Sequence, residues 1–327
     1  MSQHLQLRLS VFIFRQQKLL RTLSESDMQS YSRSLIFSGA FFLLVSCNTA
    51  PAPTPPNSLN VMSFNIRFNN PSDGENAWPS RKALVANTVQ FYRADLIGVQ
   101  EALKEQLDDL SALLPEFAWL GVGRDDGKEL GEYSAILYRK DRLEVLQQVT
   151  FWLSEEPEQP GSVGWDAAIT RVVTWAKFQD KRDAKVFFLF NTHFDHVGQR
   201  AREESAKLLL RQIQNVAGSE PVIVTGDFNA TASNLVYEIL VGDAVEQDSL
   251  TPAHGLINAR DISMLPHYGP DWTFHDFGRA TERPGIDYIF VNHRLNVLRH
   301  GVIADPAGGP YTSDHLPVLA EVVIQKK

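Results

Sequence analysis

The chain has 327 residues, of which 43% are hydrophobic and 10% aromatic, enough for one large core or two medium ones and too apolar for a disordered protein. Its formal net charge is −8, and because residues 1–46 carry a balance of +3, the remainder carries −11. This acidic balance disfavours a tight, nonspecific grip on long nucleic acid, which normally requires a basic surface.

The first 58 residues have the pattern of an export signal followed by a tether. The run SRSLIFSGAFFLLVSC contains a basic flank, then about a dozen mostly apolar residues, then Cys47 as the only cysteine of the chain. It resembles a bacterial lipoprotein signal, and it is shorter than the roughly 20 apolar residues of a membrane span. We expect residues 1–47 to be the signal segment, with lipid on Cys47, and residues 48–58 to be a proline-rich tether. The alternative is an apolar N-terminal helix with a chance cysteine.

Met28 offers a second start of translation, which would give a signal of ordinary length. Residues 1–27 are therefore expected either to be untranslated or to lack structure. A lone cysteine excludes a disulfide framework, so export is tolerated but not required. We expect a monomer that is exported and anchored by lipid to the cell envelope, facing the periplasm or the cell surface.

From residue 59 onward, strand-like apolar runs alternate with helical patterns. The first part predicts a strand at 59–66, a helix at 79–93 with a proline in its first turn, a strand at 95–101 and a helix at 102–114. Four strand-like runs follow, too close together for helical crossovers, so we expect them to be antiparallel: 133–139, 143–153, 170–178 and 185–194.

The last third continues with a helix at 199–216, a strand at 221–227, a short helix at 233–241 and three strands at 286–291, 296–303 and 316–324. The sequence has neither an internal repeat nor a glycine-rich phosphate loop. This order predicts an α+β domain over residues 59–327, a four-layer α/β/β/α sandwich of two packed mixed sheets flanked by helices, and not a Rossmann unit.

Polar side chains collect at the ends of these strands. The run VIVTGDFNA shows the problem, because a buried strand ends in a carboxylate, and burying a carboxylate costs several kcal/mol unless it is paired or holds a cation. Each residue has an ordinary alternative, since such residues also cap helices, occupy turns or pack in cores. The set as a whole consists of Asn65, Glu101, His193, Asp227, Asn229, Asp287, Asp314 and His315.

One rim of a packed sheet would gather these side chains into a single acidic pocket. Oxygen ligands without cysteine suit Mg²⁺, Mn²⁺ or Ca²⁺ better than a structural zinc. Two histidines beside such an ion suit proton transfer near neutral pH. The pattern therefore predicts a metal-assisted hydrolytic site.

Six motifs carry a resemblance to a known family: SFNIR, IGVQE, NTHFDH, TGDFN, GIDYIF and SDHLPV, in this order over residues 61–318. Together they resemble the endonuclease/exonuclease/phosphatase superfamily of metal-dependent phosphoesterases. Longer stretches such as NPSDGENAWPSRK resemble an exported bacterial subgroup of it. The resemblance implies the sandwich fold, Mg²⁺ or Mn²⁺ as cofactor, and hydrolysis of phosphate esters by in-line attack of activated water.

The resemblance also implies a role for each residue of the set. Glu101 is similar to the principal metal ligand, with Asn65 beside it on metal or phosphate and Asp314 as a further metal-side carboxylate. Asp227 and Asn229 resemble the pair that positions and activates the attacking water. His315, oriented by Asp287, resembles the conserved histidine partner, and His193 resembles the second histidine, which touches the phosphate or protonates the leaving oxygen.

Three further predictions are open to alternatives. Arg171 is expected to bind the phosphoryl group, although an arginine on a strand is commonly a surface residue. Glu132 is expected to orient His193, although it reads equally well as an exposed charge. Asp195 and His196 could join His193 as zinc ligands, but their spacing on a strand-to-loop segment disfavours this.

The sequence leaves the substrate open. A phosphodiesterase or phosphatase acting on a phosphate ester is the first hypothesis, and a nuclease acting on DNA or RNA is the alternative. A catalytically silent binding module of the same fold is the third, disfavoured because no metal or histidine position is missing. Fold alone cannot choose among them.

Overall fold

The computed structural model describes residues 57–242, 255–304 and 311–325. The predicted signal segment, the second start at Met28 and all of the tether except its last two residues lie outside the described residues. None of the described helices is both long and apolar enough to cross a membrane.

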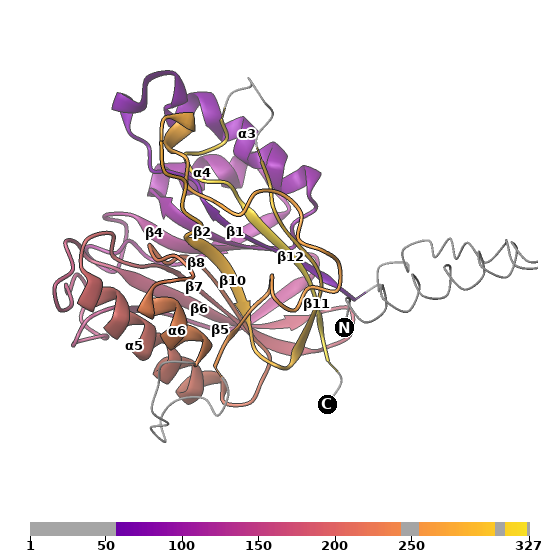
Figure 1. Ribbon diagram of the computed structural model, residues 1–327. Coiled ribbons are helices and arrows are strands. Elements are labelled where there is room, and N and C mark those ends of the chain that lie inside the picture. Colours follow the sequence, from indigo (N-terminus) through magenta and orange to yellow (C-terminus); the bar gives the residue numbers. More distant parts are fainter. Residues whose placement is uncertain (1–56, 243–254, 305–310, 326–327) are drawn as a thin grey trace, which may run out of the picture. The chain divides into compact units, whose positions relative to one another are not determined.

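Two six-stranded sheets make up the centre of the described fold (Figure 1). The first sheet has the order β11-β12-β1-β2-β4-β3, with β1 (Leu59–Asn65), β2 (Leu96–Ala102), β3 (Phe117–Leu120), β4 (Tyr133–Arg139), β11 (Leu295–Val302) and β12 (Val318–Ile324). The second has the order β5-β6-β7-β8-β10-β9, with β5 (Leu143–Trp152), β6 (Val172–Asp180), β7 (Val186–His193), β8 (Val222–Asp227), β9 (Ile257–Asn258) and β10 (Asp287–Val291).

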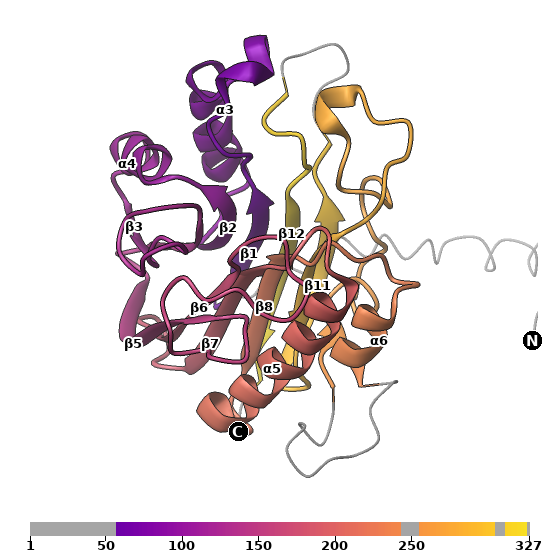
Figure 2. The ribbon, with the colours of Figure 1, turned by 90° about the vertical axis from the view of Figure 1, so that its left-hand side faces the viewer.

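Helices cover the outer face of each sheet (Figures 1 and 2). The first sheet packs against α3 (Trp78–Phe91) and α4 (Lys104–Leu113), and the second against α5 (Gln199–Ala217) and α6 (Leu235–Val241). Two short 3₁₀ helices, η2 (Pro71–Asn76) and η3 (Asp276–Gly278), lie in connecting segments.

Alternation along the strands creates three hydrophobic layers. In β1, Leu59 and Val61 face the second sheet, whereas Met62 and Phe64 face the helices. Because both faces of the strand are covered, β1 is apolar at almost every position, as expected for a strand buried on both sides.

The predicted four-layer α+β sandwich is confirmed, and helix and strand boundaries agree to within about two residues. One prediction was wrong in part. Only β5, β6 and β7 form an antiparallel series, because the preceding strand, β4, belongs to the other sheet and pairs with β2 and β3. A connection of three residues carries the chain from one sheet to the other. The short strands β3 and β9 were not predicted.

A buried polar cluster joins the two sheets behind the rim. The side chain of Asn191 in β7 donates to the carbonyls of Val99 and Ala135 in the first sheet, at 2.8 and 2.9 Å. Its Oδ1 accepts from Gln100 in the first sheet and from Thr225 in the second. A Cβ at position 98 would lie 2.0 Å from the Thr225 hydroxyl, so only Gly98 allows this approach.

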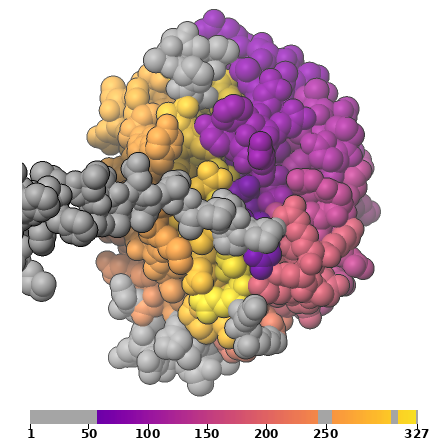
Figure 3. All heavy atoms as spheres, turned by 90° about the vertical axis from the view of Figure 1, so that its right-hand side faces the viewer, coloured from indigo at the N-terminus to yellow at the C-terminus, as the bar shows by residue number. Residues whose placement is uncertain are grey.

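The first and last strands of the domain are neighbours. Leu59 in β1 lies opposite Val322 in β12, and Figure 3 shows indigo and yellow segments side by side on this face. Residues about 260 positions apart along the chain are therefore hydrogen-bonded partners in the centre of the first sheet.

A pair of histidines ties the segment after β9 to β11. Nδ1 of His267 lies 3.0 Å from Nδ1 of His300, and Nε2 of His267 donates to the carbonyl of Pro270. One of the two Nδ1 atoms donates to the other, so the two rings are hydrogen-bonded partners. Burial, with His267 nearby, lowers the pKa of His300 to about 3.

The free energy of unfolding should therefore fall as the pH drops below about 6.5, because His300 then binds a proton in the unfolded chain but not in the folded protein. Between pH 7 and pH 5, protonation of His300 in the unfolded chain should lower the free energy of unfolding by about 2 kcal/mol. The variant His300→Gln should lack this part of the pH dependence. Urea unfolding of both proteins at the two pH values measures it. An identical pH dependence in the variant would contradict the assignment.

Candidate active site

Strand pairing brings the predicted residues to one rim. His193 ends β7 and Asp227 ends β8, and these two parallel strands place the residues directly opposite each other. On the other side, Asp227 lies opposite Asp287, the first residue of β10. Three predicted residues from separate parts of the chain therefore form one row across the end of the second sheet.

The side chain of Asn65 connects this row to the first sheet. Asn65 is fully buried at the end of β1, and its Nδ2 donates to Oε1 of Glu101 and to Oδ2 of Asp227, both at 3.0 Å. Its Oδ1 accepts from the backbone N–H of Arg67, which fixes the orientation of the amide. Glu101 and Asp227 are thus held in one site although they belong to different sheets.

The backbone is strained where it presents these side chains. Glu101 has a φ of 62°, and the pairing of β2 with β4 shifts register between Val99 and Ala102. Arg67 and Asn229 also have positive φ, of 57° and 47°. Positive φ is unfavourable for a glutamate or an arginine, and such outliers concentrate at functional sites.

A partly exposed and a buried carboxylate, those of Glu101 and Asp314, form the predicted metal side of the rim. Oε2 of Glu101 accepts from the backbone N–H of Phe68 at 3.2 Å, and Oδ1 of Asp314 accepts from the Ser313 hydroxyl. The guanidinium of Arg67 lies between them, 3.9 Å from Glu101 and 3.7 Å from Asp314. Burial raises the pKa of Asp314 above its ordinary value.

His315, Asp287 and Asp227 form a buried hydrogen-bonded chain. Nδ1 of His315 donates to Oδ2 of Asp287 at 2.8 Å, and its Nε2 lies 3.7 Å from Oδ2 of Asp227. Burial acts to lower the pKa of His315, but Asp287 and Asp227 outweigh it and hold that pKa well above its ordinary value. Burial and the charge of Asp287 raise the pKa of Asp227 to about 7. His315 is therefore protonated near neutral pH, next to a carboxylate that can exchange a proton there.

His193 has the opposite character. The side-chain amide of Asn229 donates to the carbonyl of Phe194 and to Nε2 of His193, at 3.0 and 3.1 Å. Burial lowers the pKa of His193 well below its ordinary value, and Arg171 and Arg124 act in the same direction. His193 is therefore neutral, with its proton on Nδ1, in the free protein.

Arg171 is a buried cation at the site and not the surface residue that its strand position allowed. It is 4% exposed, its Nε lies 3.5 Å from Oδ1 of Asp195 in a buried ion pair, and its Nη1 has no hydrogen-bond partner. Its Nη2 lies 3.0 Å from Nδ1 of His196. Unpaired buried N–H groups are costly, so an anion is expected to satisfy them when one is bound.

Glu132 does not make the predicted contact with His193. Both of its carboxylate oxygens accept from Arg124, at 2.7 and 2.9 Å, and Nδ1 of His193 has no hydrogen-bond partner. The bidentate arginine provides stronger hydrogen bonds than a neutral imidazole could. Glu132 is nevertheless not an exposed charge, because it lines the cavity together with Arg171 and His193.

The zinc alternative for the HFDH motif finds no support. Oδ2 of Asp195 accepts from the backbone N–H groups of Ala168, Val197 and Gly198, at 3.2, 2.9 and 2.8 Å. Three such bonds mark Asp195 as an organiser of the turn before α5. His196 is held by Arg171.

The rim surrounds a cavity of about 630 Å³. It is lined by the charged residues described above and by the apolar residues Phe68, Ile169, Ala230, Phe274, Pro284 and Ile286. A cavity that combines convergent polar groups with apolar side chains is typical of a small-molecule binding site.

Arg81 was missed by the sequence analysis because an arginine in an amphipathic helix usually faces solvent. It is 1% exposed, and Nη1 donates to the carbonyls of Ile66 and Thr312, both at 2.8 Å. Nη2 donates to the carbonyl of Arg67. Burial lowers the pKa of Arg81 to about 10. Arg81 thus ties the segment after Asn65 to the segment before Asp314.

The donor set at the rim fits a hard divalent cation. Glu101, Asp314 and Asn65 offer oxygen atoms, and the buried carboxylate of Asp314 close to that of Glu101 is a cost that a cation would relieve. Another group of three, Asp227, Asp287 and His315, has its ligand atoms within 4.8 Å of one another. In that group His315 and Asp287 are bonded to each other, so fewer atoms are free to bind an ion.

The model of the endonuclease/exonuclease/phosphatase family matches residues 62–315. The chain belongs to this family. Its members are phosphoesterases and nucleases that generally depend on divalent metals, which supports hydrolase activity in general terms.

Solved structures of family members resemble the chain closely. A Bacteroides vulgatus endonuclease/exonuclease/phosphatase is 41% identical and covers 82% of this chain and 99% of its own, with a TM-score of 0.77. A mannosyl-6-phosphatase from Bacteroides thetaiotaomicron is 35% identical, with coverages of 81% and 100% and a TM-score of 0.74. The human nocturnin catalytic domain, 21% identical with coverages of 82% and 94% and a TM-score of 0.62, shares the fold.

Removing Arg81 should loosen the rim. Arg81→Met should lower the free energy of unfolding by roughly 3 kcal/mol, because it leaves buried carbonyls without donors. Lys82→Met changes the neighbouring residue, whose exposed ion pair with Asp109 should contribute less than about 1 kcal/mol. Urea denaturation measures the free energy of unfolding of both variants. Equal losses would show that the hydrogen bonds of Arg81 contribute no more than the exposed ion pair of Lys82.

Proposed function

We propose that the protein hydrolyses phosphate esters, with a Mg²⁺ or Mn²⁺ ion at the rim and a water molecule attacking phosphorus in line. The buried amide of Asn65 is the observation that carries the proposal. It donates to Glu101 and to Asp227 at once, so it joins the metal side and the water-activating side in one cavity.

In this proposal Glu101, Asp314 and Asn65 would hold the ion, which would supply positive charge for the nonbridging phosphoryl oxygens. Asp227 positions the attacking water and accepts a proton from it, a role that suits a pKa of about 7. Asn229 fixes Asp227 through its backbone N–H, which donates to Oδ1 of Asp227 at 3.0 Å. The charge on His315, held by Asp287, stabilises negative charge beside Asp227.

Arg171 and His193 face the phosphoryl group from the second sheet. The unpaired Nη1 of Arg171 supplies donors for phosphoryl oxygens, whose charge grows in the transition state. A neutral histidine is a poor general acid, so we assign His193 to contact with the phosphoryl group and not to protonation of the leaving oxygen. Glu132 pairs with Arg124, and its negative charge offsets part of the positive charge near Arg171.

The substrate is proposed to be a small phosphate ester, and a phosphorylated sugar in particular. The 35% identical mannosyl-6-phosphatase supports this, as does the acidic charge of the chain, which disfavours polymeric nucleic acid. A nuclease acting on DNA or RNA is the second candidate, because the family includes nucleases. A silent binding module is disfavoured because the described site lacks none of the predicted residues.

Asp227→Asn and His315→Gln should each lower kcat by about a thousandfold or more while leaving the melting temperature within a few degrees of wild type. Both changes preserve shape and remove an ionisable group. Asp108→Asn, at an exposed carboxylate of α4, should leave kcat unchanged. The assay uses hexose 6-phosphate, a generic phosphodiester and single-stranded DNA with Mg²⁺ or with EDTA. Turnover of DNA alone would favour the nuclease, and no turnover of any would favour the binding module.

We further propose that the chain is exported and anchored by a lipid on Cys47, with residues 48–58 as tether and residues 59–327 as a monomeric domain. The signal-like sequence supports this, and translation from Met28 would suit it best. Cys47→Ala should abolish incorporation of radioactive palmitate and release the protein from the membrane fraction. Unchanged membrane association in the variant would leave the apolar-helix alternative.

A further inference from the structure

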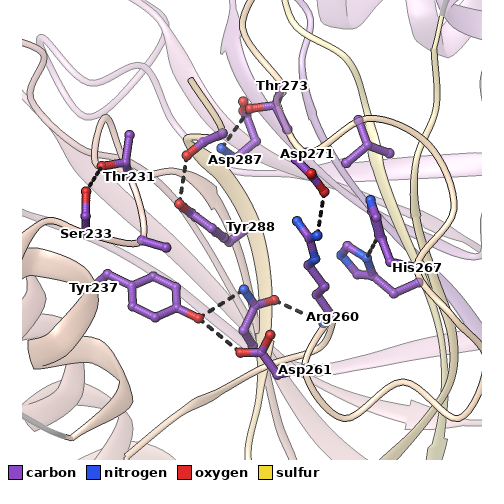
Figure 4. Close-up of a pocket in the computed structure, with 15 residues that line it drawn as sticks. Thr231, Ser233, Tyr237, Arg260, Asp261, His267, Asp271, Thr273, Asp287 and Tyr288 are labelled. Carbon is purple, nitrogen blue, oxygen red and sulfur yellow. Dashed lines mark hydrogen bonds and ion pairs between the residues drawn. The ribbon is translucent and has the colours of Figure 1, made fainter. Parts of the chain in front are cut away.

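A second cavity, of about 570 Å³, adjoins the catalytic cavity (Figure 4). Residues 284–287 form part of the wall between them. Pro284 and Ile286 line the catalytic cavity, whereas Gly285 and Asp287 line the second. Thr231 lines both cavities, so it marks the place where they meet.

The dividing wall is rigid. The hydroxyl of Thr273 accepts from the backbone N–H groups of Ile286 and Asp287, at 3.0 and 3.1 Å. A Cβ at Gly285 would lie 2.7 Å from the carbonyl oxygen of Asp271, so the segment before Thr273 packs directly against the wall. The second cavity is therefore preformed, as binding sites for small molecules usually are.

The lining of the second cavity is polar, and Arg260, the one arginine or lysine in the described lining, is paired with a carboxylate. Arg260 and Asp271 form an ion pair at 2.5 Å, and the hydroxyl of Tyr237 donates to Asp261 at 3.2 Å and accepts from Asn258 at 3.1 Å. Figure 4 shows the Tyr237 hydroxyl directed at Asp261, and Arg260 directed at Asp271. The described lining thus offers no surplus cation for an anionic ligand, and it is too polar for a lipid chain.

Aromatic rings complete this lining. Tyr237 and Tyr288 lie with ring centroids 5.5 Å apart, and both rings border the cavity. A tyrosine ring gives an apolar face to the C–H groups of a sugar, while carboxylates, amides and hydroxyls nearby can bond its hydroxyl groups. A neutral, polyhydroxylated ring is the ligand that matches both features.

We propose that the second cavity binds a sugar ring of the leaving group, so that the preferred substrate is a phosphorylated oligosaccharide and not an isolated sugar phosphate. The proposal rests on the proposed function, since it names the part of the substrate that lies beyond the ester. The sugar that carries the phosphate occupies the catalytic cavity, and the next sugar passes Thr231 into the second. Binding energy gained away from the reacting atoms then raises kcat/KM.

The test blocks the second cavity without touching the catalytic one. Ala232 lines the second cavity alone and is exposed, so Ala232→Trp can fill the entrance without disturbing the core, and Ala232→Ser is the matched control. The substrates are p-nitrophenyl phosphate, a hexose 6-phosphate, and a disaccharide that carries the 6-phosphate on its non-reducing ring.

Wild type and Ala232→Ser should hydrolyse the disaccharide phosphate with a kcat/KM about tenfold or more above that of the hexose phosphate. Ala232→Trp should bring the two within about twofold and leave p-nitrophenyl phosphate unchanged. Binding of the unphosphorylated disaccharide, followed by saturation-transfer NMR, should be lost in the same variant.

Three outcomes would overturn the proposal: equal kcat/KM for both sugar phosphates in wild type, a preference that survives Ala232→Trp, or an equal loss on all three substrates in that variant. An absence of turnover on every substrate, with the disaccharide still bound in wild type and not in Ala232→Trp, would instead reject the proposed hydrolysis and retain the sugar site.

Discussion

The carboxamide of Asn65 is the contact on which the site depends. Glu101 and Asp227 come from β2 and β8, strands of different sheets, and without a shared donor these two neighbouring carboxylates, one partly exposed and one buried, would repel each other. One amide nitrogen bonded to both carboxylates removes part of that repulsion and sets their separation. The backbone N–H of Arg67 donates to the amide oxygen of Asn65 and fixes its orientation. The positive φ of Arg67 therefore helps to position the two carboxylates.

A second layer of polar contacts makes this geometry reproducible. Asn191 bonds to the backbone of β2 and β4 and to the side chain of Thr225, and the absence of a side chain at Gly98 lets the sheets approach there. Buried polar networks that are well satisfied define one arrangement where apolar side chains alone would tolerate several. The contacts of Asn191 therefore fix the position of one sheet relative to the other near the rim of the candidate active site.

Much of this could be predicted from the sequence because it follows from local patterns. Apolar alternation located the long strands and helices, and a carboxylate at the end of a buried strand, as in VIVTGD, indicated that Asp227 faces something that stabilises charge. Placing Glu101, Asp227 and His315 on one rim required that the two packed sheets share a rim, where β2 and β8 end and the antiparallel strand β12 begins. The structure brings these three together, with Asn65, Asp287 and Asn229 around them.

Other parts could not be predicted because they depend on contacts between distant segments. Arg81 reads as one more charge on an amphipathic helix until the carbonyls of Ile66 and Thr312 are seen around it. Glu132 was expected to face His193, but the loop before β4 brings Arg124 to it instead. The order of strands cannot be obtained from alternation, which is why β4 was grouped with β5.

The position of β12 in the first sheet could not be predicted from alternation either, and it has a consequence for biosynthesis. This strand inserts between β11 and β1, the earliest strand of the domain, and Asp314 and His315 directly precede it. Until β12 has been synthesised, the edges of β11 and β1 that it covers stay open and Asp314 and His315 are not held at the rim, so the proposed site forms only after this strand has joined the sheet.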